Sequence, residues 1–446
     1  MNKRILGLAL PNIVTNITLP LLGMVDTAIM GHLSAAHLAA IAIGTQIFNL
    51  IYWNFGFLRM GTSGLTAQAY GANDMDESVR TFIRAISIAL LVALALIVLQ
   101  WPLAKLSELI FEGSEGVLQM ALTYFFVRIW AAPATLGLYA IKGWFTGMQN
   151  SRLPMWIAIF LNCVNILCSL LFVLVLHWDI QGVALGTVIA QYSGLAVGLF
   201  FLYRKYGQLF VSYRQRNSIA DALRWTEMRR FFKVNGDIFL RTVCLAAVFT
   251  YITIASGKIS DEILAVNTLL LQFFTLFSYI MDGFAYAGES LVGRYIGARD
   301  TRSLRKAVRL ILLWGLILTL AFTLIYALGG KGILHIFSDE ADIIAAAQPY
   351  LFWTLVIPVC GFAAFLFDGI FIGATASRAM RNCMFVATAA FFALYFGLNN
   401  LLILNSQFST LNSNNILWSA FMLFLLLRGI GQAALLKPAV YNQLEF

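Results

Sequence analysis

The chain has 446 residues, of which 60% are hydrophobic and only 11% are charged, and its mean hydropathy is +0.81. A soluble protein of this length carries about 25% charged residues, so the composition excludes an ordinary water-soluble protein and indicates that lipid is the main solvent. The net charge of +9 comes from basic residues that form no separate soluble domain. We therefore expect contact with anionic lipid headgroups and no binding of nucleic acid.

The first apolar stretch begins directly after Lys3 and Arg4 and continues to about Met30. A basic start followed by an apolar run is typical of a signal peptide, but no cleavage site of small residues follows. We therefore interpret this stretch as the first transmembrane helix, which needs about 20 mostly apolar residues. Runs of this kind recur along the chain and predict twelve transmembrane helices, over residues 5–30, 38–68, 81–104, 118–141, 153–176, 182–203, 232–256, 263–292, 308–329, 344–370, 382–403 and 413–435.

The basic residues of the connections test this count. If the connections are numbered alternately from a cytoplasmic N-terminus, the cytoplasmic set holds 24 of the 30 Lys and Arg, and the opposite set holds only Lys105, Lys258 and Lys331. The positive-inside rule predicts this bias for an even number of spans. We expect a multi-pass inner-membrane protein, present as a monomer, with both termini in the cytoplasm.

The chain repeats itself at one constant offset, the shift that carries Gly71 onto Gly297. Residues 71–74 (GAND) then overlie 297–300 (GARD), and residues 143–147 (GWFTG) overlie 369–373 (GIFIG) without a gap. One offset that holds at two distant places indicates a duplication. Six helices per repeat give both halves the same orientation, so we predict two six-helix bundles related by a pseudo-twofold axis along the membrane normal, with a cavity between them.

The predicted organisation is an N-lobe over residues 1–203, a cytoplasmic inter-lobe loop over 204–231 and a C-lobe over 232–446. The loop is the longest and most basic connection. Two bundles around a central site suit transport by alternating access. A duplication retained for packing alone is the alternative.

Five acids fall within the predicted spans, and each is a functional hint because a carboxylate at the bilayer centre costs at least about 2.5–3.5 kcal/mol on insertion scales. Asp26 follows Pro11 and Pro20 on the same helix. Proline removes a backbone donor and permits bending, and burial favours the protonated form of a carboxyl group. A bendable helix with one acid predicts a switch operated by a proton or a cation. The alternative is an acid satisfied by hydrogen bonds to neighbouring helices.

The remaining four acids lie in the second half. Asp237 and Arg241 are four residues apart on one helix, so they share a face and we expect them to form a structural ion pair, with a role in substrate binding or coupling as the alternative. Asp282 and Glu289 are seven apart and also share a face. Asp368 begins the second copy of the repeated GxxxG element, where the first copy has Lys142.

One or two of Asp282, Glu289 and Asp368 are predicted to bind a cationic substrate. Arg59 is predicted to anchor its helix through carbonyls or a carboxylate, with a direct role in transport as the other hypothesis.

Motifs of enzymes and ATP-driven pumps are absent from the sequence. No P-loop, HExxH or GxSxG motif occurs, so we predict that the chain is not an enzyme, needs no cofactor and draws on an ion gradient. The four histidines fall at or near the outer ends of predicted helices and are interpreted as interfacial residues: His32, His37, His177 and His335.

Several segments resemble the multidrug and toxic compound extrusion (MATE) family, in particular its DinF-like branch. The first half contributes residues 23–33 (GMVDTAIMGHL) and 57–68 (FLRMGTSGLTAQ), and the second half contributes 235–242 (NGDIFLRT), 282–285 (DGFA) and 368–373 (DGIFIG). The resemblance covers essentially the whole chain. It implies a two-lobed antiporter that exports organic cations and other amphipathic drugs against inward H+ or Na+.

The resemblance also implies a cation site in the N-lobe. The family's key acid on helix 1 matches Asp26, and its Asn on helix 5 and Thr on helix 6 match Asn165 and Thr187. The family's helix 5 Asp is replaced by Ser169. Because this removes a charge and an oxygen ligand from a hard-cation site, we favour H+ as the coupling ion, with Na+ at Asp26, Asn165 and Thr187 as the alternative. A lipid-linked precursor flippase of the same superfamily is a further alternative.

Overall fold

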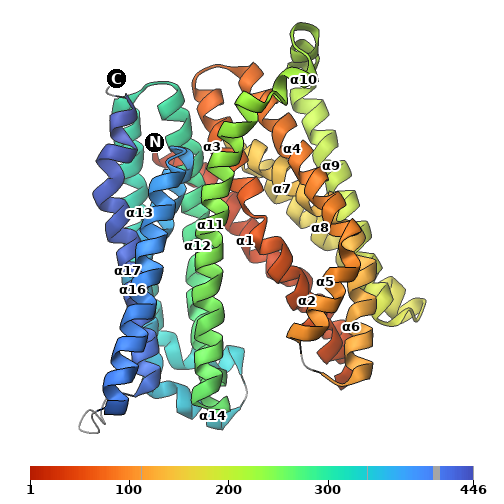
Figure 1. Cartoon of the computed structure of the whole chain (residues 1–446), viewed down its shortest axis with the longest axis vertical. Helices are drawn as coiled ribbons and strands as arrows, with labels where there is room; N and C mark the ends of the chain where they lie inside the picture. The colour runs from red at the N-terminus through yellow and green to blue at the C-terminus, as the bar shows by residue number, and fades with distance from the viewer. Residues whose placement is uncertain (112, 339, 405–411, 445–446) are drawn as a thin grey trace. The chain divides into compact units, whose positions relative to one another are not determined.

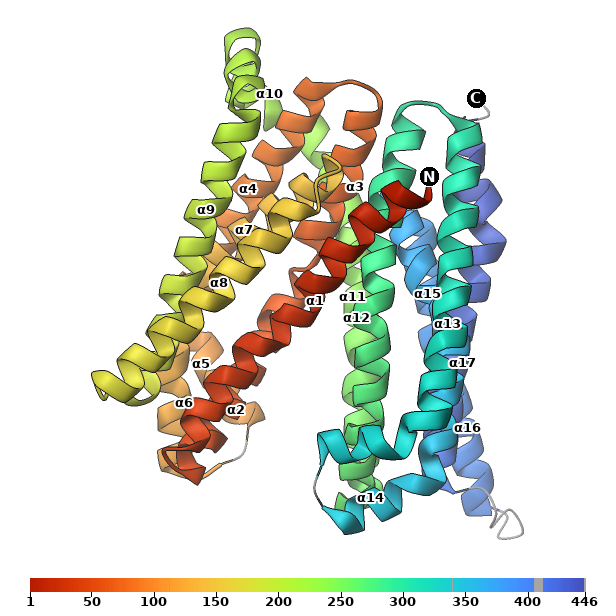
Figure 2. The same ribbon diagram turned by 180° about the vertical axis from the view of Figure 1, so that it is seen from behind.

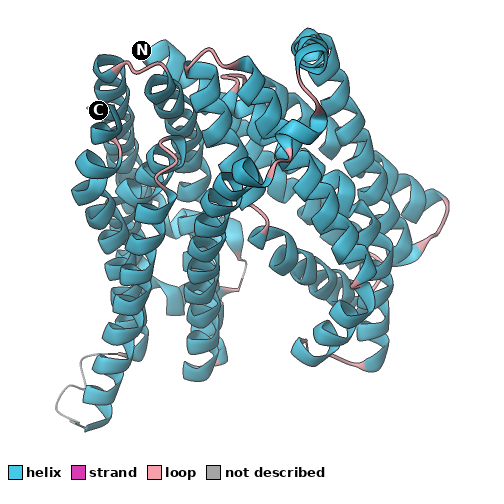
Figure 3. Cartoon of the chain, turned by 45° about the horizontal axis from the view of Figure 1, so that its top comes forward, coloured by secondary structure: helices cyan, strands magenta, loops and turns pink. Residues whose placement is uncertain are grey.

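The computed structural model describes residues 1–111, 113–338, 340–404 and 412–444, and these residues form helices joined by short loops (Figures 1 and 3). The prediction of an all-α membrane protein with twelve spans is confirmed. The twelve stretches long and apolar enough to cross a bilayer are Asn2–Gly31, Ala35–Gly71, Met75–Val98, Glu115–Gly147, Arg152–Val175, Asp179–Arg216, Met228–Ile259, Asp261–Gly297, Thr301–Phe337, Ala341–Gly373, Ser377–Asn400 and Ser413–Leu444.

The chain forms two compact units. The N unit is Leu10–Asn235, and the C unit combines Met1–Ala9 with Gly236–Phe446. The helices of the N unit, which shares α1 and α11 with the C unit, are α1 (Asn2–Gly31), α2 (Ala35–Asn54), α3 (Phe57–Gly71), α4 (Met75–Val98), α5 (Gln100–Ile110), α6 (Glu115–Arg128), α7 (Ala132–Gly147), α8 (Arg152–Leu170), α9 (Asp179–Arg216), α10 (Ile219–Ala222) and α11 (Trp225–Ile259).

The remaining helices belong to the C unit: α12 (Asp261–Gly297), α13 (Thr301–Phe337), α14 (Ala341–Ala347), α15 (Leu351–Gly373), α16 (Ser377–Leu404) and α17 (Ser413–Ala439). The first turns of α1 join this unit, where Arg4 Nη1 donates a hydrogen bond to the Tyr295 hydroxyl at 3.4 Å.

Most of the segment 204–231, which we expected to be a loop, is helical. α9 continues to Arg216 beyond the end of the predicted apolar span, and α10 follows it (Figure 1). Arg216 Nη2 binds Asp76 Oδ1 of α4 at 2.9 Å, and Arg84 Nε donates to the Ala222 carbonyl at 2.8 Å. Polar contacts hold this extension, so a count of apolar residues does not detect it.

The buried and exposed residues of α4 indicate that the helix is surrounded by lipid. The helix buries Ala85, Ala89 and Ala93 and exposes Leu91 and Leu94 at 68% and 63% of their surfaces. Small residues at helix contacts allow the backbones to approach closely, which is how helices associate in membranes. Large apolar side chains on the outside suit a lipid environment.

The duplication is visible in the backbone. Asn73 and Arg299 have positive φ angles of 59° and 53°, and Gln149 and Thr375 have φ angles of 61° and 51°. Both pairs are related by the offset that carries Gly71 onto Gly297. Because few non-glycine residues adopt this conformation, two pairs at one offset are strong evidence that the halves share a common local structure.

The glycines of the repeated element make the same close approach in both units. At Gly143 on α7, a side chain would collide with the carbonyl of Arg59 on α3, and at Gly369 on α15 it would collide with the carbonyl of Ala285 on α12. Arg59 and Ala285 are themselves equivalent positions of the repeat. The duplication therefore extends to helix packing within each unit.

Candidate functional site

Asp26 lies in the N unit on α1 and is only 2% exposed. Each of its carboxyl oxygens has a hydroxyl partner from another helix. Ser169 Oγ of α8 donates to Asp26 Oδ1 at 3.0 Å, and Thr187 Oγ1 of α9 lies 3.3 Å from Asp26 Oδ2. The structure thus brings the predicted helix 1 acid together with Ser169 and Thr187 from two further spans.

Asn165 completes this group, which we call the Asp26 site (Asp26, Asn165, Ser169 and Thr187). Asn165 Nδ2 donates to Thr187 Oγ1 at 3.1 Å. Asn165 is fully buried, and its Oδ1 atom has no hydrogen-bond partner in the described chain. An acceptor left unsatisfied in a buried site costs free energy, so this oxygen is available to a water molecule or a cation.

The packing of α8 on α9, which run side by side in Figures 1 and 2, positions the hydroxyls. Asn165 and Ser169 are four residues apart, so both face the same side of α8. Gly186 of α9 allows the contact, because a Cβ there would lie 3.0 Å from Ser169 Oγ and 3.1 Å from its backbone nitrogen. Asn162 Nδ2 donates to the Thr18 carbonyl of α1 at 2.7 Å and fixes the proline-containing helix against α8.

Arg128 supplies positive charge to the same region and was given no role by the sequence. It interacts electrostatically with Asp26. Its guanidinium donates to the Tyr124 hydroxyl at 2.5 Å and lies 4.7 Å from the ring centre of Phe48. From the sequence, Arg128 is recognisable only as an arginine within a predicted span, because no pattern there links it to Asp26.

Asp368, on α15 of the C unit, has three polar partners. Arg241 of α11 and Arg428 of α17 both bind Asp368 Oδ2, the latter at 2.7 Å, and Gln432 Nε2 donates to Oδ1 at 2.7 Å. All four side chains are buried. Arg428 lies inside α17, within the predicted span 413–435.

The expected pairing of Asp237 with Arg241 is wrong. Asp237 instead binds Arg381 Nη1 at 2.5 Å and accepts a hydrogen bond from Ser377 Oγ at 2.8 Å, both on α16. Arg241 is bound to Asp368. Two residues four apart can share a helix face, but here each finds a partner on a different neighbouring helix.

The other three predicted residues lie on α12 and α3. Asp282 of α12 is partly exposed and acts electrostatically on Arg428, while Glu289 of the same helix is fully buried. Arg59 lies near the start of α3 against Gly143 of α7. The structure thus separates the predicted C-lobe acids: Asp368 is held by arginines, Asp237 is paired, and Asp282 is partly accessible.

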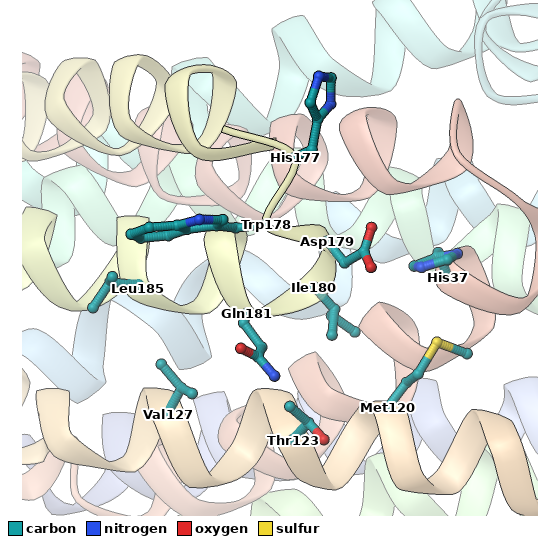
Figure 4. Close-up of a pocket in the computed structure, with 10 residues that line it drawn as sticks. All are labelled: His37, Met120, Thr123, Val127, His177, Trp178, Asp179, Ile180, Gln181 and Leu185. Atoms are coloured by element: carbon teal, nitrogen blue, oxygen red, sulfur yellow. The ribbon is translucent and has the colours of Figure 1, made fainter. Parts of the chain in front are cut away.

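A pocket of about 660 Å³ opens in the N unit where α2 and α9 begin. In Figure 4 the ring of His37 lies near Asp179, whereas His177 points away from it; Trp178 and Gln181 also line the pocket. Asp26 does not line it. In the described chain no group of three or more His, Cys, Asp or Glu is arranged to hold a metal ion.

Comparison with known proteins gives matches over nearly the whole chain. A family model described as MatE matches residues 11–171 and 238–397. DNA damage-inducible protein F of Escherichia coli (strain K12) is 37% identical over 438 residues, covering 97% of this chain and 92% of the relative. Multidrug resistance protein MdtK of Edwardsiella ictaluri (strain 93-146) is 20% identical and covers 94% of this chain and 92% of its own length.

Solved structures share the fold. The Vibrio cholerae MATE transporter VcmN in the bent form has a TM-score of 0.82 at 18% identity, covering 99% of this chain and 97% of that chain. A MOP superfamily transporter from Pyrococcus furiosus has a TM-score of 0.79 at 18% identity, covering 100% and 96%. At these identities the likeness shows the fold alone.

Proposed function

Because this chain belongs to the MatE family, whose members are multidrug efflux transporters and not enzymes, we propose that it exports amphipathic, often cationic molecules in exchange for protons. The twelve candidate spans among the described residues make it a multi-pass membrane protein, and its membership of a transporter family implies small-molecule substrates. The Asp26 site is the proposed place at which the proton binds.

The observation that carries this proposal is that the Asp26 site can satisfy the carboxyl group in both protonation states. When Asp26 is ionised, Ser169 and Thr187 donate to it at 3.0 and 3.3 Å. When it is protonated, Oδ2–H can donate to Thr187 Oγ1, whose own hydrogen can turn to the Val183 carbonyl at 3.2 Å. A hydroxyl group has one donor and two acceptor sites, so it can reverse its role without moving.

Sodium coupling is the second candidate, and the unpartnered Asn165 Oδ1 favours it. Together with the Asp26, Ser169 and Thr187 oxygens it adds a neutral ligand to a site that has one carboxylate. Hard cations prefer oxygen ligands and bind more tightly as carboxylates are added. With serine at position 169, the site offers a sodium ion less charge than two carboxylates would.

We also propose a membrane orientation, an oligomeric state and a limited set of ligands for the protein. An even number of spans and the basic bias of the connections support cytoplasmic positions for both termini in the inner membrane. We also propose that the protein acts as a monomer, requires no cofactor besides the coupling ion and does not bind nucleic acid.

Efflux from proteoliposomes with separately imposed pH and Na+ gradients tests the coupling ion. We expect export of a fluorescent organic cation to be driven by the pH gradient and to fall to the level of protein-free vesicles in Asp26→Asn, which mimics a permanently neutral carboxyl group. Asp261→Asn, at an exposed acid at the start of α12, is the matched control and should transport normally.

Two results would contradict the proposal. Export that follows the Na+ gradient alone would assign the site to sodium. Proton-driven export at the wild-type rate in Asp26→Asn would remove Asp26 from the coupling mechanism.

A further inference from the structure

Lys142 is a lysine without a counter-ion inside a membrane-spanning helix. It lies on α7 within the span Glu115–Gly147. In the described part of the chain its ammonium group forms no hydrogen bond or ion pair, and no carboxylate contributes to its electrostatic surroundings. An ionisable group within a span is costly unless it is paired, so an unpaired one is a candidate for ligand binding.

The charged group that does act on Lys142 is another cation, Arg59 of α3. The two helices touch at this level, because Gly143 packs directly on the Arg59 carbonyl. Two positive charges close together in a medium of low dielectric constant repel each other strongly. A bound anion near Lys142 would lower this repulsion and supply the missing counter-charge.

At the equivalent position of the second repeat, the charged residue is paired. Asp368 is the counterpart of Lys142 and occupies the same place before the repeated glycines. Its carboxylate is bound by two arginines and a glutamine, as described above. Among the described residues Lys142 has no such partners, although its side chain is partly exposed. The protein therefore fills one of the two equivalent positions and leaves the other open.

Two hydroxyl donors lie on α3, the helix that touches α7 at Arg59. Thr62 and Ser63 are three and four residues after Arg59, so they are on the same side of the helix. Both are fully buried, and neither hydroxyl has a hydrogen-bond partner among the described residues. An ammonium and neutral hydroxyls are the groups that bind carboxylate, sulfonate or phosphate oxygens.

We propose that Lys142 binds the anionic group of an exported amphipathic molecule, with Arg59, Thr62 and Ser63 providing the positive and polar surroundings. This inference rests on the proposed efflux function and extends its substrate class from cations to amphipathic molecules that carry a carboxylate, sulfonate or phosphate. An anionic lipid headgroup offers the same chemistry, and the test separates the two sources.

The test compares export of two fluorescent dyes from proteoliposomes under a proton gradient. Tetramethylrhodamine methyl ester is a cation, and sulforhodamine B has a similar ring system with two sulfonates. We expect the wild type to export both dyes, and Lys142→Met to raise the KM for sulforhodamine B by about tenfold or more, the effect of losing one charged hydrogen bond. Export of the cationic dye should be unchanged, which also shows that the variant folds.

Lys142→Arg should keep most sulforhodamine export because it preserves the charge. Lys105→Met is the matched control, because Lys105 on α5 is exposed and the substitution is the same. The assay is run in vesicles with and without anionic lipid. An effect of Lys142→Met seen only with anionic lipid would overturn the proposal in favour of a lipid headgroup.

Equal KM values for sulforhodamine B in the wild type and Lys142→Met would also overturn it, as would a wild type that exports only the cation. Failure of the wild type to export either dye would refute the proposed efflux function itself, and this inference with it.

Discussion

Asp26 and Asp368, two buried aspartates, differ in the charge of their hydrogen-bond partners. Ser169 and Thr187 bind Asp26 through neutral hydroxyls, whereas two guanidinium groups bind Asp368. Opposite charges nearby favour the ionised form of a carboxyl group, and their loss leaves a buried charge unpaired. Asp26 can therefore gain and lose a proton during a cycle, while Asp368 is suited to holding helices together.

Substitution of Asp368 tests this division of roles. Asp368→Asn leaves Arg241 and Arg428 without their buried carboxylate, and we expect it to destabilise the C unit by about 3 kcal/mol. The measurement is the apparent melting temperature of the purified protein in detergent, with Asp26→Asn for comparison. An unchanged melting temperature together with abolished transport would instead make Asp368 a transport residue.

The sequence allows the Asp26 site to be predicted because Asp26, Asn165 and Thr187 match a known family pattern and Ser169 occupies the position of the family's helix 5 Asp. It does not reveal the partners of Asp368, since Arg428 and Gln432 are 60 and 64 residues away on another helix. Lys142 directly follows the predicted span 118–141, and a lysine at the end of a span does not by itself indicate a binding site. Spacing along one helix finds shared faces but not the contacts between helices.

At the scale of elements, the repeated glycines decide how closely helices pack. α15 approaches α12 at Gly369, and α7 approaches α3 at Gly143. The GxxxG pattern predicted a repeated element, and small residues at this spacing are common at helix contacts in membranes. Which helix each would meet was not predictable, because α13 and α14 lie between α12 and α15 in the chain.

Gly→Ala substitutions at a closely packed glycine and at an unpacked glycine test the effect of this packing on stability. Gly369→Ala places a Cβ against the Ala285 backbone and should destabilise the protein by about 1–3 kcal/mol. Gly397→Ala on α16 meets no atom within 4 Å and should stabilise its helix by about 0.5–1 kcal/mol. Melting temperatures in detergent should therefore move in opposite directions. A decrease of equal size in both variants would show that backbone contact at Gly369 is not the cause.

The ends of elements were harder to predict than their number. The apolar run over 38–68 was expected to be one helix, but the structure has α2 and α3 with a turn at Phe55 and Gly56 between them. α9 extends beyond the predicted span to Arg216, whose side chain binds Asp76 of α4. Hydropathy reports whether a segment is apolar enough for lipid, so it does not detect a turn within an apolar segment or a helix that continues past the segment's end.

At the scale of the whole molecule, the chain passes between the two units inside helices. It leaves the C unit after Ala9 in α1 and returns to it at Gly236 in α11. Pro11 lies just beyond the first crossing, where the missing backbone donor weakens the helix. Both connections between the units therefore lie within helices.

The orientation of the whole chain follows from its spans and is the last prediction. Twelve spans with most basic residues in one set of connections should place both termini in the cytoplasm. Green fluorescent protein fused after Phe446 should fluoresce, and alkaline phosphatase at the same position should be inactive. Phosphatase fused after Ser260, between α11 and α12, should be active. The reverse pattern at both sites would invert the topology, so that α1 would begin outside and the Asp26 site would face the opposite gradient.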